Sequence, residues 1–206
     1  MFLLYIIYPI LVAIWHFIGN YFYYNVNNHN FKLSRIHVSA VHASTVIIAY
    51  LINVPGYILC YWSVTYFIMD TLYELLSIWT FKSKFGLFDA GILLHHFTSI
   101  AVLRYLNYPI TEPYMLKAFY LSEISNLPMY LVYHLRTSGY TNKYLMKPLI
   151  AIEAIGYIAL RLMWGGLISF QIWFIRDIPW FMCLASTIML AISVVWTTKL
   201  VKQILI

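Results

Sequence analysis

The stretch Leu87–Leu106, LFDAGILLHHFTSIAVLRYL, is long enough to cross a membrane but carries ionisable side chains inside its apolar run. A helix needs about 20 residues, at a rise of about 1.5 Å each, to cross the hydrocarbon core of a bilayer. Asp89 lies near one end of this stretch, and His95 and His96 lie near its middle. Ionisable groups at such a depth are costly and usually functional. The stretch therefore predicts a polar site buried inside a bundle of membrane helices.

The composition extends this interpretation to the whole chain. Of the 206 residues, 63% are hydrophobic, 19% are aromatic and only 10% are charged, whereas about a quarter of the residues of a soluble domain are charged. The length leaves no room for a separate soluble domain. The two cysteines, Cys60 and Cys183, lack the spacing of a metal site, and both fall near the non-cytosolic side. A disulfide between them is geometrically possible, although a buried cysteine is more often a small hydrophobic residue.

The hydropathy pattern divides the chain into about seven apolar segments, so we predict an all-α, polytopic membrane protein. We assign residues 1–31 to a first transmembrane helix and its loop, residues 32–202 to a six-helix domain, and residues 203–206 to a C-terminal tail. The segments are Phe2–Tyr23, Ile36–Ile52, Tyr57–Trp79, Leu87–Leu106, Tyr114–Leu135, Pro148–Phe170 and Ile178–Leu200.

Loop charge predicts the orientation, because Lys and Arg gather on the cytosolic side of membrane proteins. On this rule the N-terminus is lumenal and the C-terminus is cytosolic, as an odd number of spans requires. The opposite side holds Arg104, at a segment end, and Arg176. The basic side holds Lys32, Arg35, Lys82, Lys84, Arg136, Lys143, Lys147, Lys199 and Lys202.

Five of the segments carry polar side chains at helical spacing. Most of these side chains fall in the cytosolic half of the segments or near their middle, so we expect them to face one shared, water-accessible interior. Glu153 and Arg161 share a face, which favours an ion pair between them over a substrate clamp, and both interpretations stay open. The residues are Arg35 and His42 in the second segment, Asp70 and Glu74 in the third, Asp89, His95, His96 and Ser99 in the fourth, Glu123 and Asn126 in the fifth, and Glu153 and Arg161 in the sixth.

Four motifs in this order resemble the TLC domain, a family that includes translocon-associated TRAM proteins, ceramide synthases and TLC-domain-containing proteins. The resemblance runs from about Lys32 to Lys202. The motifs are RIHVSAVHA at Arg35–Ala43, YFIMDTLYE at Tyr66–Glu74, LHHFTSI at Leu94–Ile100 and SEISNLPMYLVYHL at Ser122–Leu135.

The resemblance implies a helical membrane protein of the endoplasmic reticulum that acts on lipid. In ceramide synthases paired histidines and downstream aspartates are implicated in acyl-CoA-dependent N-acylation, and His95 and His96 stand at the histidine positions. The hydroxyl that follows the pair in that family corresponds to Ser99. The downstream His-Asp-x-x-Asp pattern is here Ser122-Glu123-Ile124-Ser125-Asn126. The chain therefore looks closer to the TLC-domain-containing group, for which roles in lipid homeostasis are proposed.

We accordingly predict a pocket open to the cytosol that binds a membrane lipid or fatty acyl chain, with no nucleic acid and no metal. If the protein is an enzyme, acyl transfer from acyl-CoA as co-substrate is the expected chemistry, with no bound cofactor. The predicted catalytic residues are His95, His96, Asp70 and Glu123, and the predicted substrate-binding residues are Arg35, His42, Glu74, Asp89, Ser99, Asn126 and Arg161.

Two alternatives remain at this point. The first is a lipid-binding regulator of membrane composition with the same pocket and no turnover. The second is a seven-helix receptor or a metal or haem protein. Short loops leave little room for an extracellular ligand. Adjacent histidines splay about 100° apart on a helix, which makes His95 and His96 poor ligands for one metal ion.

Overall fold

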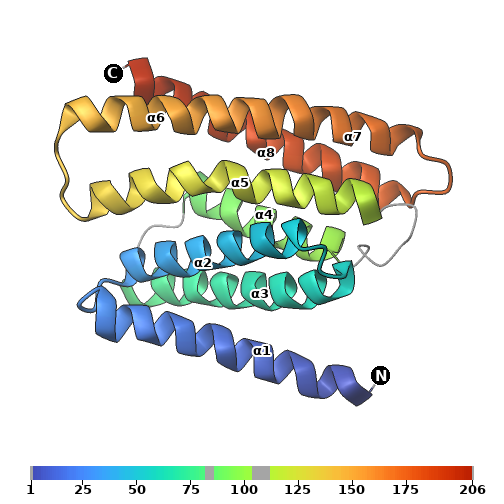
Figure 1. Ribbon diagram of the computed structural model, residues 1–206, viewed down its shortest axis with the longest axis horizontal. Helices are drawn as coiled ribbons and strands as arrows, with labels where there is room; N and C mark the ends of the chain where they lie inside the picture. Colours follow the sequence, from blue (N-terminus) through green and yellow to red (C-terminus); the bar gives the residue numbers. More distant parts are fainter. Residues whose placement is uncertain (1, 82–85, 104–111, 206) are drawn as a thin grey trace.

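Helices account for nearly all of the computed structural model, which describes residues 2–81, 86–103 and 112–205 (Figure 1). Within these ranges the chain forms helices and turns and no strand, which confirms the predicted all-α class. The helices are α1 (Phe2–Tyr21), the π-helix η1 (Phe22–Val26), α2 (Phe31–Leu51), α3 (Gly56–Phe81), α4 (Leu87–Leu103), α5 (Glu112–Thr137), α6 (Lys143–Tyr157), the π-helix η2 (Ile158–Trp164), α7 (Gly165–Phe174) and α8 (Trp180–Leu205).

These elements join into seven helical rods over the described residues. The backbone stays in the right-handed helical region at Ile158 and at Gly165, so α6, η2 and α7 form one continuous rod. Likewise α1 continues into η1 through helical dihedral angles at Tyr21. Successive rods run in opposite directions, so that α1 begins at one end of the bundle and α8 ends at the other (Figure 1). The seven predicted segments correspond to these rods in order.

Two of the described rods are long and apolar enough to cross a membrane, Ile6–Val26 and Trp180–Ile204. A third helix, Asp89–Leu103, is apolar but shorter. The other rods bury charged or amide side chains, such as Asp70 and Glu123, which lower their mean hydropathy. A membrane location is therefore supported for two helices, and the seven spans with their orientation stay a prediction.

Local sequence explains where the helices start. Asn30 precedes α2, and its side-chain oxygen accepts a hydrogen bond from the backbone N–H of Leu33 at 3.1 Å. Asn142 caps α6 in the same way, through the N–H of Tyr144 at 3.0 Å. Asparagine is among the strongest N-cap residues, because its oxygen satisfies a backbone donor that the helix cannot.

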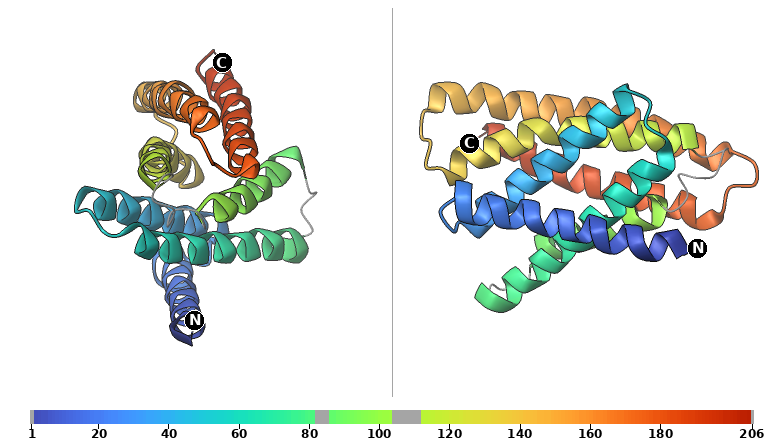
Figure 2. Two further views of the ribbon diagram at one scale, coloured as in Figure 1. Left: turned by 90° about the vertical axis from the view of Figure 1, so that its right-hand side faces the viewer. Right: turned by 60° about the horizontal axis from the view of Figure 1, so that its bottom comes forward.

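Helix α1 lies on the outside of the bundle (Figure 2). Helix α1 packs on α3, α2 packs on α5, and α8 packs on α4 and α6. The fully buried Trp15 anchors α1, since its indole N–H donates to the backbone oxygen of Trp62 at 3.2 Å and its ring also contacts Tyr66. Cys60 and Cys183 are buried in the same core and are not bonded to each other.

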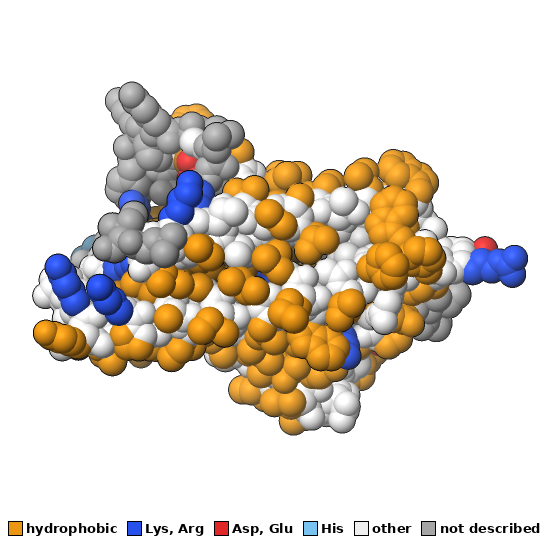
Figure 3. All heavy atoms as spheres, turned by 90° about the horizontal axis from the view of Figure 1, so that it is seen from above, with side chains coloured by type: hydrophobic (Ala, Val, Ile, Leu, Met, Phe, Trp, Pro, Cys, Tyr) orange, Lys and Arg blue, Asp and Glu red, His pale blue; other side chains and the backbone are white. Residues whose placement is uncertain are grey.

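Basic side chains gather at one end of the bundle, where α2 and α6 begin and α5 and α8 end. Figure 3 shows Lys and Arg side chains gathered toward this end, hydrophobic side chains over much of the middle of that face, and a basic side chain again at the opposite tip. Lys82, Lys84 and Arg104 of the predicted charge pattern lie outside the described residues. The described residues of the predicted basic side are here called the basic rim: Lys32, Arg35, Arg136, Lys143, Lys147, Lys199 and Lys202.

Candidate functional site

A cavity of about 240 Å³, here called the outer cavity, lies between α2, α3, α4, α5, the α6–η2 rod and α8. It opens toward the basic rim, because Arg136, Lys199 and Gln203 from the ends of α5 and α8 are among its lining residues. The structure brings together seven of the predicted site residues in this wall: Arg35, Asp70, His95, His96, Glu123, Asn126 and Arg161.

An ion cluster on one wall joins α2 to α3. The guanidinium of Arg35 donates from Nε to Asp70 Oδ1 at 3.0 Å, and its Nη1 pairs with the Glu74 carboxylate. The side chains of Asp70 and Glu74 are 9% and 8% exposed, against 21% for Arg35. Arg35 therefore reaches in from the rim and pairs with two buried carboxylates. The i, i+4 spacing of Asp70 and Glu74 places both on the same face of α3.

The two adjacent histidines have different surroundings. His96 Nδ1 lies 3.0 Å from the hydroxyl of Thr71, and its Nε2 lies 3.3 Å from Asp70 Oδ2. Both ring nitrogens of His96 are thus occupied by α3. His95 points elsewhere: its ring contacts Trp196 of α8, and its buried Nδ1 has no hydrogen-bond partner among the described residues. His95, not His96, offers a free nitrogen to a ligand.

A second polar group occupies the α5 wall. Arg161 donates from Nε to the Ser125 hydroxyl at 2.8 Å, and from Nη2 to Asn126 Oδ1 at 2.8 Å and the Ser122 carbonyl at 3.1 Å. Asn126 in turn donates to Glu123 Oε2 at 3.3 Å. The predicted Arg161–Glu153 ion pair is not present among the described residues. In the structure Arg161 turns from its own rod toward α5, where three oxygen acceptors converge.

Three buried polar atoms of the described chain lack a hydrogen-bond partner, and all three belong to residues that line the outer cavity. They are His95 Nδ1, Glu153 Oε2 and the hydroxyl of Tyr157. A buried polar group without a partner costs free energy comparable to a lost hydrogen bond. Their convergence on one space indicates that a ligand or water completes them.

Glu153 and Tyr157 were not among the predicted site residues, although their i, i+4 spacing with Arg161 was a usable signal. Trp196 and Lys199 were missed as well, because α8 carries no ionisable side chain before its last two turns. A tryptophan and a lysine near the end of a helix are typical of the membrane–water interface, so nothing in the sequence assigned Trp196 and Lys199 to the site.

Three predicted site residues, His42, Glu74 and Asp89, line neither this cavity nor the second one described below. His42 is only 1% exposed: its Nε2 meets the Ser63 hydroxyl at 3.1 Å, its ring stacks on Tyr66, and its Nδ1 is 3.9 Å from Glu123. Glu74 pairs with Arg35 and is not among the residues that line the cavity. The predicted inward position of Asp89 is corrected, since its carboxylate accepts the Gly86 backbone N–H at 2.7 Å at the start of α4. An acidic residue in the first helical turn is a capping group.

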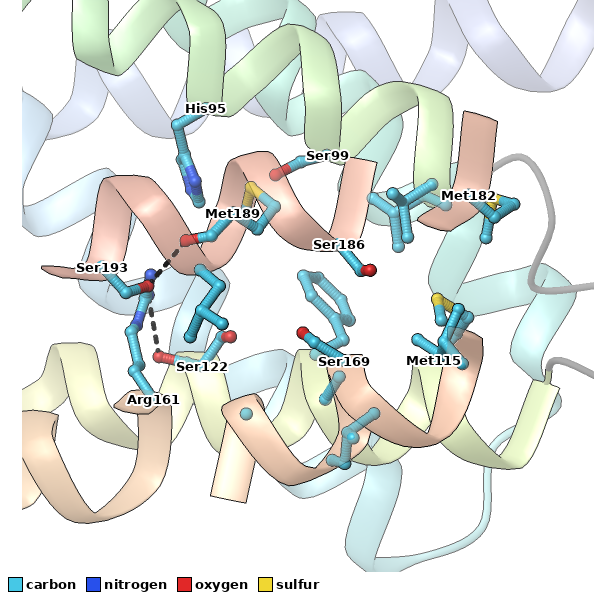
Figure 4. A pocket seen from close by; sticks show the side chains of 18 of the residues that line it. His95, Ser99, Met115, Ser122, Arg161, Ser169, Met182, Ser186, Met189 and Ser193 are labelled. Carbon is cyan, nitrogen blue, oxygen red and sulfur yellow. Dashed lines mark hydrogen bonds between the residues drawn. The ribbon is translucent and has the colours of Figure 1, made fainter. Parts of the chain in front are cut away.

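A second cavity of about 110 Å³, here called the inner cavity, continues away from the rim (Figure 4). It shares Phe67, His95, Glu123 and Arg161 with the outer cavity, so these four side chains stand at the junction. The eleventh predicted site residue, Ser99, lines this inner cavity. Most of its wall is apolar, and Met115 and Met182 lie at the end remote from Arg161 (Figure 4).

Comparison with protein-family models, with curated proteins and with solved structures finds no match to this chain. The TLC resemblance therefore stays a prediction. Among the described residues no group of three or more His, Cys, Asp or Glu side chains is placed to hold a metal ion.

Proposed function

We propose that this protein is a multi-pass membrane protein of the endoplasmic reticulum, with a lumenal N-terminus and a cytosolic C-terminus, which binds a lipid acyl chain and transfers it from acyl-CoA. The exposed apolar side chains found on every helical rod support the membrane location, because such surfaces are rarely left to water. The basic rim supports the orientation through the charge bias of membrane loops.

The junction of a polar and an apolar cavity carries the proposal. A charged outer cavity that opens at the basic rim suits the phosphates of acyl-CoA. The apolar inner cavity beyond it suits a hydrocarbon chain. An acyl-CoA laid along both would place its thioester near the junction, where His95 Nδ1 lacks a partner.

The chemistry follows from this placement. His95 takes the proton of an amine or hydroxyl acceptor, whose lone pair attacks the thioester carbonyl carbon. The tetrahedral intermediate collapses with cleavage of the carbon–sulfur bond, and the CoA thiolate leaves and takes up the proton from His95. Arg161 lies at the same junction, where its positive charge stabilises the oxyanion. Asp70 acts through His96, which it holds in place, and Glu123 orients Asn126.

Lipid binding without turnover is the second candidate, and a specific observation favours it. No carboxylate among the described residues contacts His95, whereas a catalytic histidine usually has a partner that fixes its tautomer. Asp70 contacts His96 instead, whose nitrogens are both occupied. In this alternative the same cavities hold a lipid and exchange it unchanged.

The test uses the full chain in lipid nanodiscs, incubated with palmitoyl-CoA and an extract of membrane lipids, with release of free CoA as the readout. Loss of a general base typically costs 10²- to 10⁴-fold in rate, so His95→Ala should slow release by at least about 100-fold. His29→Asn, a change in an exposed loop, is the matched histidine control and should match the wild type.

Absence of CoA release from the wild type, together with saturable binding of the acyl chain, would leave the second candidate. Absence of both release and binding would reject the proposed function altogether.

A further inference from the structure

The inner cavity is unusual in its hydroxyl content. Five serines from four helices line a space whose other walls are mostly apolar. Figure 4 shows labelled serines on opposite walls, from the Arg161 end toward the end that holds Met115 and Met182. The serines are Ser99 of α4, Ser122 of α5, Ser169 of α7, and Ser186 and Ser193 of α8.

Two of these hydroxyls are satisfied within their own helix. Ser186 donates to the carbonyl of Cys183 at 2.9 Å, and Ser193 donates to the carbonyl of Met189 at 2.8 Å. This back-bonding is the ordinary behaviour of serine in a membrane helix. The hydroxyls of Ser186 and Ser193 therefore need no ligand to complete their hydrogen bonding.

The hydroxyls of Ser99, Ser122 and Ser169 make no hydrogen bond within the described part of the chain. Ser99 is 7% exposed and its side chain points into the cavity (Figure 4), so the contents of the cavity decide what partner its hydroxyl has. Three helices thus each aim an unpaired hydroxyl into one space. A purely hydrocarbon ligand would seal them there without partners, which is unfavourable.

We propose that the inner cavity binds a long chain that carries an oxygen function, a hydroxyl or a keto group, away from its head group. This inference rests on the proposed function and deepens it, because it names the class of chain. The apolar wall packs the methylene groups, and the hydroxyls of Ser99, Ser122 and Ser169 exchange hydrogen bonds with the oxygen. Because the three hydroxyls are spread along the cavity, a chain oxygen can find a hydrogen-bond partner at more than one depth.

Ordered water is the other way to satisfy these hydroxyls, and a direct comparison of two probes separates the two. Stearate and 12-hydroxystearate have the same chain length and differ in one mid-chain hydroxyl. Each competes with a fluorescent fatty acid for the full chain in detergent micelles. A single neutral hydrogen bond is worth about a fivefold change in affinity, and two give about 25-fold.

The wild type should bind 12-hydroxystearate at least about fivefold more tightly than stearate, and Ser99→Ala combined with Ser169→Ala should reduce that preference, with Ser122 left as the remaining partner. The affinity of the double variant for stearate should be equal to or higher than that of the wild type. Ser44→Ala, on the exposed face of α2, is the matched control and should keep the preference. The single variants Ser99→Ala and Ser169→Ala serve if the double variant does not fold, and each should reduce the preference.

Equal affinity of the wild type for the two acids would overturn the inference while leaving the proposed lipid binding intact. A preference that the two serine substitutions leave undiminished would also overturn it. Failure of both acids to bind would overturn the inference and the proposed function together.

Discussion

Replacing Arg35 by methionine tests whether the ion cluster of the outer cavity holds α2 to α3. The substitution roughly keeps the length of the side chain and removes the guanidinium that pairs with both Asp70 and Glu74. Breaking a buried ion pair typically costs about 3–5 kcal/mol, because the partner charge is left uncompensated. Since the Arg35 side chain is 21% exposed, the lower limit, about 3 kcal/mol, is appropriate.

For a chain of this size, 1 kcal/mol shifts the unfolding temperature by about 2–4 °C, so Arg35→Met should lower it by about 6–12 °C. Thermal unfolding of the purified protein in detergent, followed by intrinsic fluorescence, measures the shift. Lys32→Met, an exposed lysine one turn earlier on α2, is the control and should change the unfolding temperature by less than about 2 °C.

A triple variant separates lost charge from lost packing. Adding Asp70→Asn and Glu74→Gln to Arg35→Met removes the two uncompensated charges while keeping side chains of similar shape. The triple variant should recover at least half of the lost unfolding temperature, because replacement of a whole buried ionic cluster is often close to neutral. A single variant as stable as the wild type, or a triple variant less stable than the single, would refute the reasoning.

Three further predictions follow from the fold. Asp89→Ala should cost about 0.5–2 kcal/mol by removing a cap from α4 and should leave acyl-chain affinity unchanged, which thermal unfolding and binding together measure. Cys60 and Cys183, both buried and unpaired, should react with a maleimide only after denaturation, and equal migration with and without reductant checks that no disulfide forms. Glycosylation acceptor sites inserted at residues 53–55 should be modified in microsomes and those at 138–142 should not; the reverse pattern would invert the proposed orientation.

The positions of the helices were predictable from the sequence, because each rod is a long apolar run between polar turns. Asparagine caps before α2 and α6, and the NVPG turn after α2, mark boundaries that the structure keeps within a few residues. What the pattern did not reveal is the π-helical turn at Ile158–Trp164 inside the predicted segment Pro148–Phe170. A π-helix has no sequence signature comparable to a cap or a turn.

Most residues of the candidate site were predictable from the sequence, because charged side chains inside apolar segments are expected to face the interior of the bundle. Seven predicted residues line the outer cavity and Ser99 lines the inner one, because charged groups in apolar rods have nowhere else to find partners. Individual pairings were not predictable. Arg161 binds three oxygens of α5 instead of Glu153, since helical spacing fixes the face of a side chain but not which neighbouring rod it meets.

The different contacts of His95 and His96 follow from the geometry of the helix that carries them. Adjacent residues on a helix point about 100° apart, so one histidine can meet α3 while its neighbour cannot. Asp70 and Thr71 then fix His96, and Asp70 also receives Arg35, which couples the histidine to the basic rim through two side-chain contacts. His95 is left at the junction of the two cavities with an unpaired nitrogen. Two adjacent histidines on one helix therefore need not be equivalent: His96 is fixed to α3, and His95 faces the junction of the two cavities.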